Sequence, residues 1–332
     1  MLLLNLKRFD LNVQTTLKNT TGNDLSPEMK TFYDKALLKF AKPNLVHDQF
    51  AQKRNIPKNG GKTIEFRRYS QLPKALTALT EGVTPNGQNL NVTTLTATVA
   101  QYGGYITLSD VLLLTAIDNN LMEAIELLGD QAGRTLDTIT REVLVSGTNV
   151  LYAGGTVSAR TAITGSMKLT VADIKKAVRE LKVGLAKPIN GYYVAIVHPD
   201  VAYDIMNDTE WVNASQYAGS TQIFEGEIGK LYGVRFIETT EAKIWAKAGA
   251  SNISVYATLV MGANAYGTTN VEGGGLQSIV KQLGSGGTAD PLNQRASCGW
   301  KAIKTAEILY DDYLVRIESA SSYSNTSEDA AN

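Results

Sequence analysis

Residues 118–142, DNNLMEAIELLGDQAGRTLDTITRE, set the architecture that this chain can adopt. Apolar or small side chains recur along this stretch in alternating steps of four and three, at Leu121, Ile125, Leu128, Ala132, Leu136, Ile139 and Val143. This spacing places them on one face of a helix. At 1.5 Å per residue, roughly 25 residues make a rod of about 40 Å. A rod of this length indicates a subunit shaped to meet neighbours more than a compact enzyme.

The opposite face of the predicted helix is polar and acidic. Between Asp118 and Glu142 there are six acidic and two basic residues. Acid-before-base pairs four residues apart support an exposed helix face, and two pairs have this spacing: Asp130 with Arg134 and Asp137 with Arg141. Gly129 and Gly133 lie one turn apart, where the missing side chains allow another backbone to approach closely.

The preceding segment, residues 53–109, has the pattern of an extended β-hairpin. A turn cluster at residues 56–61, IPKNGG, precedes a predicted strand over Lys62–Tyr69. Residues 70–91 contain two prolines, two glycines and few large apolar groups, so we expect an exposed tip. The return strand is predicted over Val92–Ser109, where threonines alternate with apolar residues.

Charge is unevenly distributed between these two elements. Seven basic residues and one acidic residue lie between Lys53 and Lys74, whereas the helix is acidic. Two explanations of this charge distribution stay open. The basic segment and the acidic helix face are solvated surfaces, or they are complementary surfaces on successive copies, whose pairing sets register and association rate. On the second reading, the candidate interface residues are Lys58, Lys62, Arg67, Arg68, Lys74, Glu123, Glu126, Asp130 and Asp137.

The remaining sequence predicts an N-terminal arm, an α/β region and closing strands. Residues 1–24 lack periodicity and precede a helix that Ser26 can cap. The further expected elements are a helix from Thr170 to Gly184, a buried strand over Tyr192–Val197, a helix over Val201–Met206 that Pro199 begins, strands over Val234–Ile237 and Ile253–Met261, a glycine-rich stretch from Gly273 to Asp290 that is partly a surface loop, and closing strands over Ala302–Leu309 and Tyr313–Glu318.

No catalytic constellation emerges from the sequence. One cysteine, Cys298, rules out an intrachain disulfide, and with two histidines a Cys/His zinc site is disfavoured. Cys298 is better explained as a buried small residue than as a nucleophile. The glycine clusters at 273–275 and 284–287 do not follow a strand and open a helix, so they indicate loops and not a phosphate site. We therefore expect no metal and no cofactor.

Composition favours a protein that is made in the cytoplasm and stays off membranes. The opening Met1–Leu6 is too short for an export signal, and no later stretch approaches the ~18 apolar residues of a membrane span. Lys plus Arg and Asp plus Glu are balanced at 32 each, so the whole chain has no charge reason to condense on DNA or an anionic membrane.

Several stretches resemble those of a known family, the major capsid proteins of tailed bacteriophages with the Hong Kong 97-type fold. They are LSPEMK at 25–30, PNLVHDQF at 43–50, IPKNGGKT at 56–63, LTEGV at 79–83 and GDQAGRTLD at 129–137. The order of arm, basic hairpin, long helix, α/β region and closing strands is similar too. The resemblance covers most of residues 25–318 and is more specific in the first half.

This resemblance implies an α+β fold and a structural role. It implies these parts: an N-terminal arm and helix at 1–52, an extended hairpin loop at 53–109, a peripheral domain with the spine helix at 110–165 and 291–320, an axial domain at 166–290, and a polar tail at 321–332. The implied function is self-assembly, as hexamers and pentamers, into the icosahedral head that encloses double-stranded DNA without reading its sequence. The implied partners are further copies, a portal, a decoration protein and, because the arm is short, a separate scaffolding protein. Such a protein resides in the virion after assembly in the host cytoplasm.

One related alternative and two alternatives of other classes are weighed against this function. An encapsulin-like compartment shares the fold, and would hold a cargo enzyme in place of DNA. A hydrolase or transferase on the α/β region would need a defined pocket with converging polar groups and a shifted pKa. A surface adhesin, suggested by the Thr- and Gly-rich strands, is disfavoured because no export signal is present.

Overall fold

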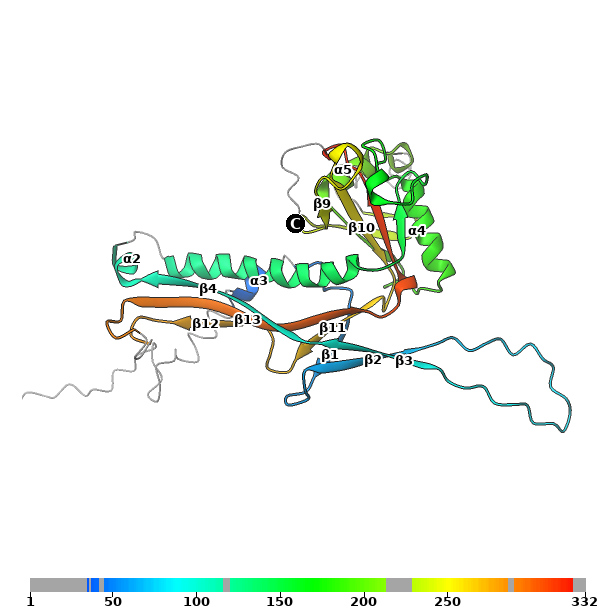
Figure 1. Ribbon diagram of the computed structural model, residues 1–332, viewed down its shortest axis with the longest axis horizontal. Helices are drawn as coiled ribbons and strands as arrows, with labels where there is room; N and C mark the ends of the chain where they lie inside the picture. The colour runs from blue at the N-terminus through cyan, green and yellow to red at the C-terminus, as the bar shows by residue number, and fades with distance from the viewer. Residues whose placement is uncertain are drawn as a thin grey trace, which may run out of the picture. The chain divides into compact units, whose positions relative to one another are not determined.

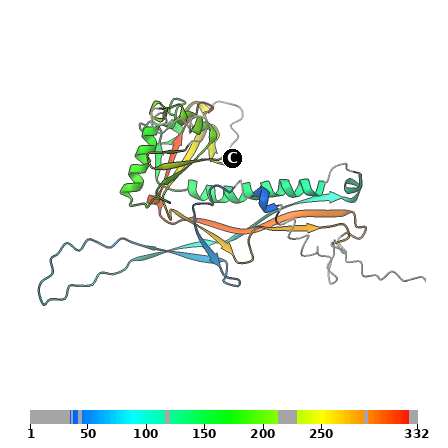
Figure 2. The same ribbon diagram turned by 180° about the vertical axis from the view of Figure 1, so that it is seen from behind.

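The computed structural model describes residues 35, 37–41, 45–115, 120–212, 229–285 and 290–324. Figures 1 and 2 show its mixed helices and strands. The chain divides into two compact units: the first contains residues 1–42, 103–132 and 276–302, and the second contains residues 43–102, 133–275 and 303–332. The predicted arm at 1–24 and the Ser26 cap lie outside the described residues.

The long helix α3 spans Asn120–Val145 and confirms the predicted rod. Its inward stripe is buried at Ile125, Leu128, Ala132 and Leu136, as the spacing predicted. A Cβ added at Gly129 would lie 2.9 Å from the carbonyl oxygen of Leu37, so the expected close approach of another backbone is also confirmed. Residues 35 and 37–41, which supply that backbone, are helical.

In the first unit, strands support the beginning of α3. The strand β12 (Gln277–Lys281) pairs antiparallel with β13 (Arg295–Ile308), from Gln277 opposite Lys301 to Lys281 opposite Ser297. On its other side β13 pairs with β4 (Ala100–Ser109). The indole Nε1 of Trp300 donates to Gln131 Oε1 at 3.0 Å, which ties β13 to α3. β12 lies inside the stretch that was predicted to be glycine-rich and partly a surface loop, and this strand was not predicted.

The second unit contains the α/β region, built on a seven-stranded sheet in the order β5-β14-β10-β6-β8-β7, with β9 paired to β10. Figure 1 shows the helices α4 and α5 beside this sheet. The bounds are β5 Val150–Tyr152, α4 Val171–Val183, β6 Tyr193–Val197, α5 Pro199–Met206, β7 Lys230–Leu231, β8 Val234–Glu238, β9 Ile244–Trp245, β10 Val255–Met261 and β14 Leu314–Ser319. Both predicted helices and the predicted strands over β6, β8, β10 and β14 are confirmed, whereas β5, β7 and β9 were missed.

Local sequence explains where the two helices begin. The Thr170 hydroxyl accepts a hydrogen bond from the backbone N–H of Asp173, which satisfies one of the free donors at the start of α4. Pro199 occupies the first turn of α5, where its missing N–H costs nothing. His198 caps that helix through Nδ1, which accepts from the N–H of Asp200 at 3.2 Å.

The C-terminal residues that the structure describes are packed, not free. Ser319 belongs to β14, and the predicted polar tail begins with the buried Ser321 and Ser324. The N–H of Ser322 donates to Asp204 Oδ2 at 2.8 Å. Residues 321–324 of the predicted polar tail are therefore packed against α5, where Asp204 supplies the acceptor, and residues 325–332 lie outside the described residues.

Candidate assembly surfaces

The predicted hairpin is present, but it is shorter than its predicted range. β2 (Thr63–Tyr69) pairs antiparallel with β3 (Val92–Thr98), from Thr63 opposite Thr98 to Tyr69 opposite Val92. The return strand ends at Thr98, because β4 pairs with β13 and not with β2. The segment before the turn forms β1 (Gln52–Ile56), which pairs in parallel with β11 (Tyr266–Val271).

An aromatic side chain anchors the base of this hairpin. Phe66 on β2 is 2% exposed and packs with Ala97 and Leu309. A Cβ added at Gly267 on β11 would lie 2.6 Å from the Phe66 ring. Because a Cβ does not approach a ring that closely, only glycine at position 267 permits this packing.

Gly267→Ala is expected to destabilise the subunit by about 1–3 kcal/mol, since the added methyl group forces Phe66 out of its site. Gly275→Ala is the matched control, because nothing lies within 4 Å of a Cβ added there. Urea denaturation of both variants measures the difference. Equal midpoints for the two would contradict the proposed anchoring role of Phe66.

Beyond the paired strands, the tip at residues 70–91 is exposed throughout. Figure 1 shows it as a long open loop that continues from β2 and β3. Large apolar side chains lie along it and at its two ends, with exposed fractions of 52% at Tyr69, 49% at Leu72, 86% at Leu76, 76% at Leu79, 63% at Val83, 62% at Leu90 and 44% at Val92. Large apolar side chains are therefore more numerous in this tip than the sequence pattern predicted. A concentration of exposed apolar side chains is typical of an interaction surface.

Most of the basic candidates are exposed on the hairpin segment. Lys58, Lys62, Arg67 and Lys74 are exposed. Arg68 is half-buried, and its guanidinium carbon lies 5.6 Å from the centre of the Tyr310 ring.

The acidic candidates lie on the first turns of α3. Glu123 and Glu126 are exposed and Asp130 is half-buried. Leu127, which is 65% exposed, lies between the acids. The first fourteen residues of α3 contain three acids and no base, so this part of the helix is both acidic and partly apolar.

Asp137 does not belong to this acidic face, which corrects the sequence analysis. It is fully buried, and its Oδ1 accepts the backbone N–H of His47 at 2.7 Å while Oδ2 lies 2.6 Å from His47 Nδ1. Arg141, the expected partner, is also buried and donates to the carbonyl of Glu241 and to Glu142. Asp137 and Arg141 are four residues apart, but their side chains bind other partners, His47 and Glu241, which the spacing does not reveal.

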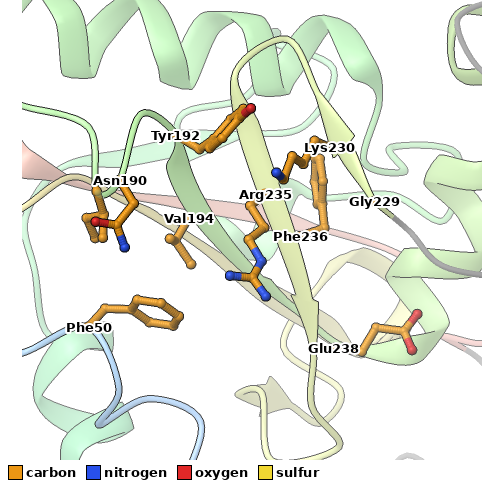
Figure 3. Close-up of a pocket in the computed structure, with 10 residues that line it drawn as sticks. Phe50, Asn190, Tyr192, Val194, Gly229, Lys230, Arg235, Phe236 and Glu238 are labelled. Carbon is orange, nitrogen blue, oxygen red and sulfur yellow. The ribbon is translucent and has the colours of Figure 1, made fainter. Parts of the chain in front are cut away.

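A hollow in the α/β region has a volume of about 650 Å³ (Figure 3). Lys230 and Arg235 project into it from β7 and β8, and Lys230 lies 4.2 Å from the Tyr192 ring centre. Burial raises the pKa of the Glu238 carboxyl at its edge. Among the described residues, none of these charged groups hydrogen-bonds another, so the hollow lacks the base-and-nucleophile contact that a hydrolase needs.

Within the described part of the chain, no three His, Cys, Asp or Glu side chains cluster closely enough to hold a metal ion. No described helix combines the length and the apolar character that crossing a membrane requires.

The chain thus combines a long helix, an α/β region and a hairpin with exposed apolar residues. The sequence model of the family described as phage capsid protein matches residues 92–304, which is more than half of the chain. The chain belongs to the phage capsid protein family. None of the curated proteins matches the sequence.

Solved capsid structures share the fold. The capsid protein of Ralstonia phage GP4 superposes with a TM-score of 0.67 at 14% identity, over 83% of this chain and 88% of that one. The cyanophage Pam1 capsid gives 0.66 at 14% identity, over 95% and 100%. The capsid of Helicobacter pylori bacteriophage KHP30 gives 0.61 at 13% identity, over 96% and 99%. The predicted α+β fold of the Hong Kong 97 type is confirmed.

Family and fold together give the function at a coarse level. This protein is a major capsid protein, a structural component of the virion that assembles with copies of itself into the phage head. The compartment and hydrolase alternatives are not favoured by these findings.

Proposed function

We propose that each subunit lays its hairpin across the next copy within hexamers and pentamers of an icosahedral head. The exposed apolar tip is the observation that supports this arrangement, because its side chains have no partner element in their own subunit among the described residues. Each side chain of this size that becomes buried contributes about 1.5–3 kcal/mol. Closure of a symmetric shell then multiplies contacts that are individually modest.

Charge is proposed to set the register of this contact. Exposed Lys62 and Arg67 on the hairpin would face exposed Glu123 and Glu126 on α3 of the neighbouring copy, with Lys58, Lys74 and Asp130 as further candidates. Rim charges of this kind govern orientation and association rate more than affinity. Asp137 is left out because its carboxylate is satisfied inside the subunit.

Charge reversal at Lys62 and Arg67 tests this pairing. Lys62→Glu with Arg67→Glu is expected to slow assembly at low salt by about tenfold or more, since steering of this kind changes association rates by 10–10³. Light scattering measures the rate, while sedimentation and negative-stain microscopy detect particles far larger than the 35.8 kDa subunit.

Two further variants make this test specific. Lys182→Glu with Lys187→Glu is a matched control, because both lysines are exposed on the α/β region. Adding Glu123→Lys and Glu126→Lys to the reversed hairpin is expected to restore the rate. Normal assembly by the reversed hairpin would refute the charge pairing.

The remaining parts of the proposal concern partners and domain roles. The balance of 32 basic and 32 acidic residues supports enclosure of double-stranded DNA without sequence-specific contacts. The family resemblance supports a separate scaffolding protein, a portal and a decoration protein, assembly in the host cytoplasm, and peripheral and axial roles for residues 110–165 with 291–320 and for 166–290. We propose no catalytic activity.

A further inference from the structure

A second hollow, of about 250 Å³, lies at the base of the hairpin. Its walls come from β1, β2, β3 and the segment that follows β13, and they include Arg54, Arg68, Tyr69, Leu95, Leu309 and Tyr310. None of the ten described residues that line it is acidic. The hollow is therefore partly apolar and carries only positive charge.

Aromatic rings hold the two inner arginines in place. The guanidinium carbon of Arg54 lies 5.4 Å from the centre of the Phe66 ring, and that of Arg68 lies 5.6 Å from the centre of the Tyr310 ring. Tyr310 in turn stacks on Tyr313 at 4.7 Å. Stacking engages the face of a guanidinium and leaves the N–H groups at its edge available for an anion.

Neither arginine has an ionic partner among the residues that the structure describes. Among the described residues, no carboxylate lies within ion-pairing distance of Arg54 or Arg68. Two guanidinium cations held in one hollow repel each other, and an anion bound between them offsets this repulsion. A carboxylate, which accepts paired N–H bonds from arginine, is the group that this geometry fits.

The hairpin tip carries one carboxylate that matches. Glu81 is the single acidic residue in 70–91 and is exposed. It occupies a β-turn in which the N–H of Val83 donates to the carbonyl of Thr80 at 3.1 Å. Gly82, with φ of +77°, permits this turn. Leu79 and Val83, which are 76% and 63% exposed, flank the carboxylate with apolar groups.

We propose that Glu81 of one copy binds Arg54 and Arg68 of the next copy, while Leu79 and Val83 pack on the apolar wall of the hollow. This inference rests on the proposed draping of the hairpin and names the place where its tip ends. The thirteen residues from Tyr69 to Glu81 can span at most about 43 Å between their terminal Cα atoms, a distance suited to crossing a neighbouring subunit. A contact of tip to base is head-to-tail, and repeated contacts of this kind close into a ring.

Engineered disulfides test the contact in assembled particles. Arg68→Cys combined with Glu81→Cys, treated with a mild oxidant, is expected to give a ladder of linked subunits up to the hexamer on a denaturing gel. The native Cys298 does not compete, because it is 1% exposed and burial raises the pKa of its thiol. Thr63→Cys with Glu81→Cys is the control, since Thr63 is exposed and lies at the opposite end of β2 from Arg68. Particles without a ladder, or equal ladders from both pairs, would overturn the inference.

A charge swap tests the same contact when a cysteine prevents assembly. Glu81→Arg alone and Arg54→Glu with Arg68→Glu alone are each expected to lower particle yield at least about tenfold, as each tenfold step is a loss of about 1.4 kcal/mol, and the triple variant is expected to restore it. If Glu81→Arg assembles normally while the arginine variant loses packaged DNA, the hollow binds phosphate. A ladder from Arg68→Cys with Glu126→Cys would show that the hollow of one copy contacts the acidic part of α3 in the next copy. Either result overturns the inference.

The two proposals can fail separately. Particles formed by a subunit without residues 70–91 would refute the draping of the hairpin itself. If that deletion abolishes particles and the Arg68–Glu81 pair still does not link, only the tip-to-base contact is wrong.

Discussion

Shells are expected not to form when an Asn-Gly turn replaces residues 70–91 and joins Tyr69 directly to Val92. Asn-Gly is the two-residue connection that β-hairpins favour, so the ladder between β2 and β3 can close. The subunit should stay folded, because every residue that is removed is exposed. Assembly should be lost because the deletion removes Leu72, Leu76, Leu79, Val83 and Leu90. Losing two of these contacts alone weakens association by at least about a hundredfold.

Sedimentation velocity and negative-stain microscopy measure this outcome, and circular dichroism checks the fold. A second variant avoids the deletion: Leu76→Ser, Leu79→Ser and Leu90→Ser remove apolar surface and keep the chain length. Thr77→Ser, Thr80→Ser and Thr84→Ser are the matched control in the same exposed loop. Particles of normal size from the leucine variant would show that the apolar tip does not drive assembly.

Local periodicity accounts for what the sequence predicted correctly. The stripe along α3 and the alternation of β2 and β3 recur within a few residues, so they are visible without tertiary information. The Thr170 cap and the Pro199 helix start are local for the same reason.

Long-range partners account for what the sequence missed. β1 pairs with β11, from Gln52 opposite Gly267 onwards, across more than 200 residues of chain, and no local pattern in β1 indicates that partner. β12 is short and lies between glycines, so its strand character is hidden. The exposed apolar residues of the tip, Leu72, Leu76, Leu79, Val83 and Leu90, are four, three, four and seven residues apart, which is helical spacing. The prolines and glycines among them disfavour a continuous helix, so the segment was interpreted only as an exposed tip.

The candidate interface shows the same limit. The basic and acidic segments are visible in the sequence as unequal charge. In the structure their exposed residues are Lys58, Lys62, Arg67, Lys74, Glu123 and Glu126. Sequence spacing did not show that the Arg68 guanidinium lies over the Tyr310 ring. Nor did it show that Asp137 binds His47, which is 90 residues away in the chain. Charge counts find a surface, whereas burial decides which of its charges are available to a partner.

The largest loss of subunit stability is expected from Asp137→Ala. Both carboxylate oxygens of Asp137 bind His47, and both residues are fully buried. The hydroxyl of Tyr266 donates to the carbonyl of His47. The Nζ of Lys304, which is 3% exposed, lies 3.1 Å from Asp48 Oδ1 and donates to the carbonyl of Leu136 at 3.2 Å. These contacts fasten residues 45–50 to α3, β11 and β13. Removing one partner of such a buried pair costs about 3–5 kcal/mol.

Asp137→Asn separates the loss of charge from the loss of a hydrogen-bond acceptor. Its amide oxygen still accepts one bond from His47, so the expected loss falls to about 1–3 kcal/mol. Glu126→Ala, on the exposed face of the same helix, should stay within about 0.5 kcal/mol of the parent. Urea denaturation should use the subunit without its tip, because assembly itself adds apparent stability. A loss below about 1 kcal/mol for Asp137→Ala would mean that packing, and not this buried pair, holds residues 45–50 on the spine helix.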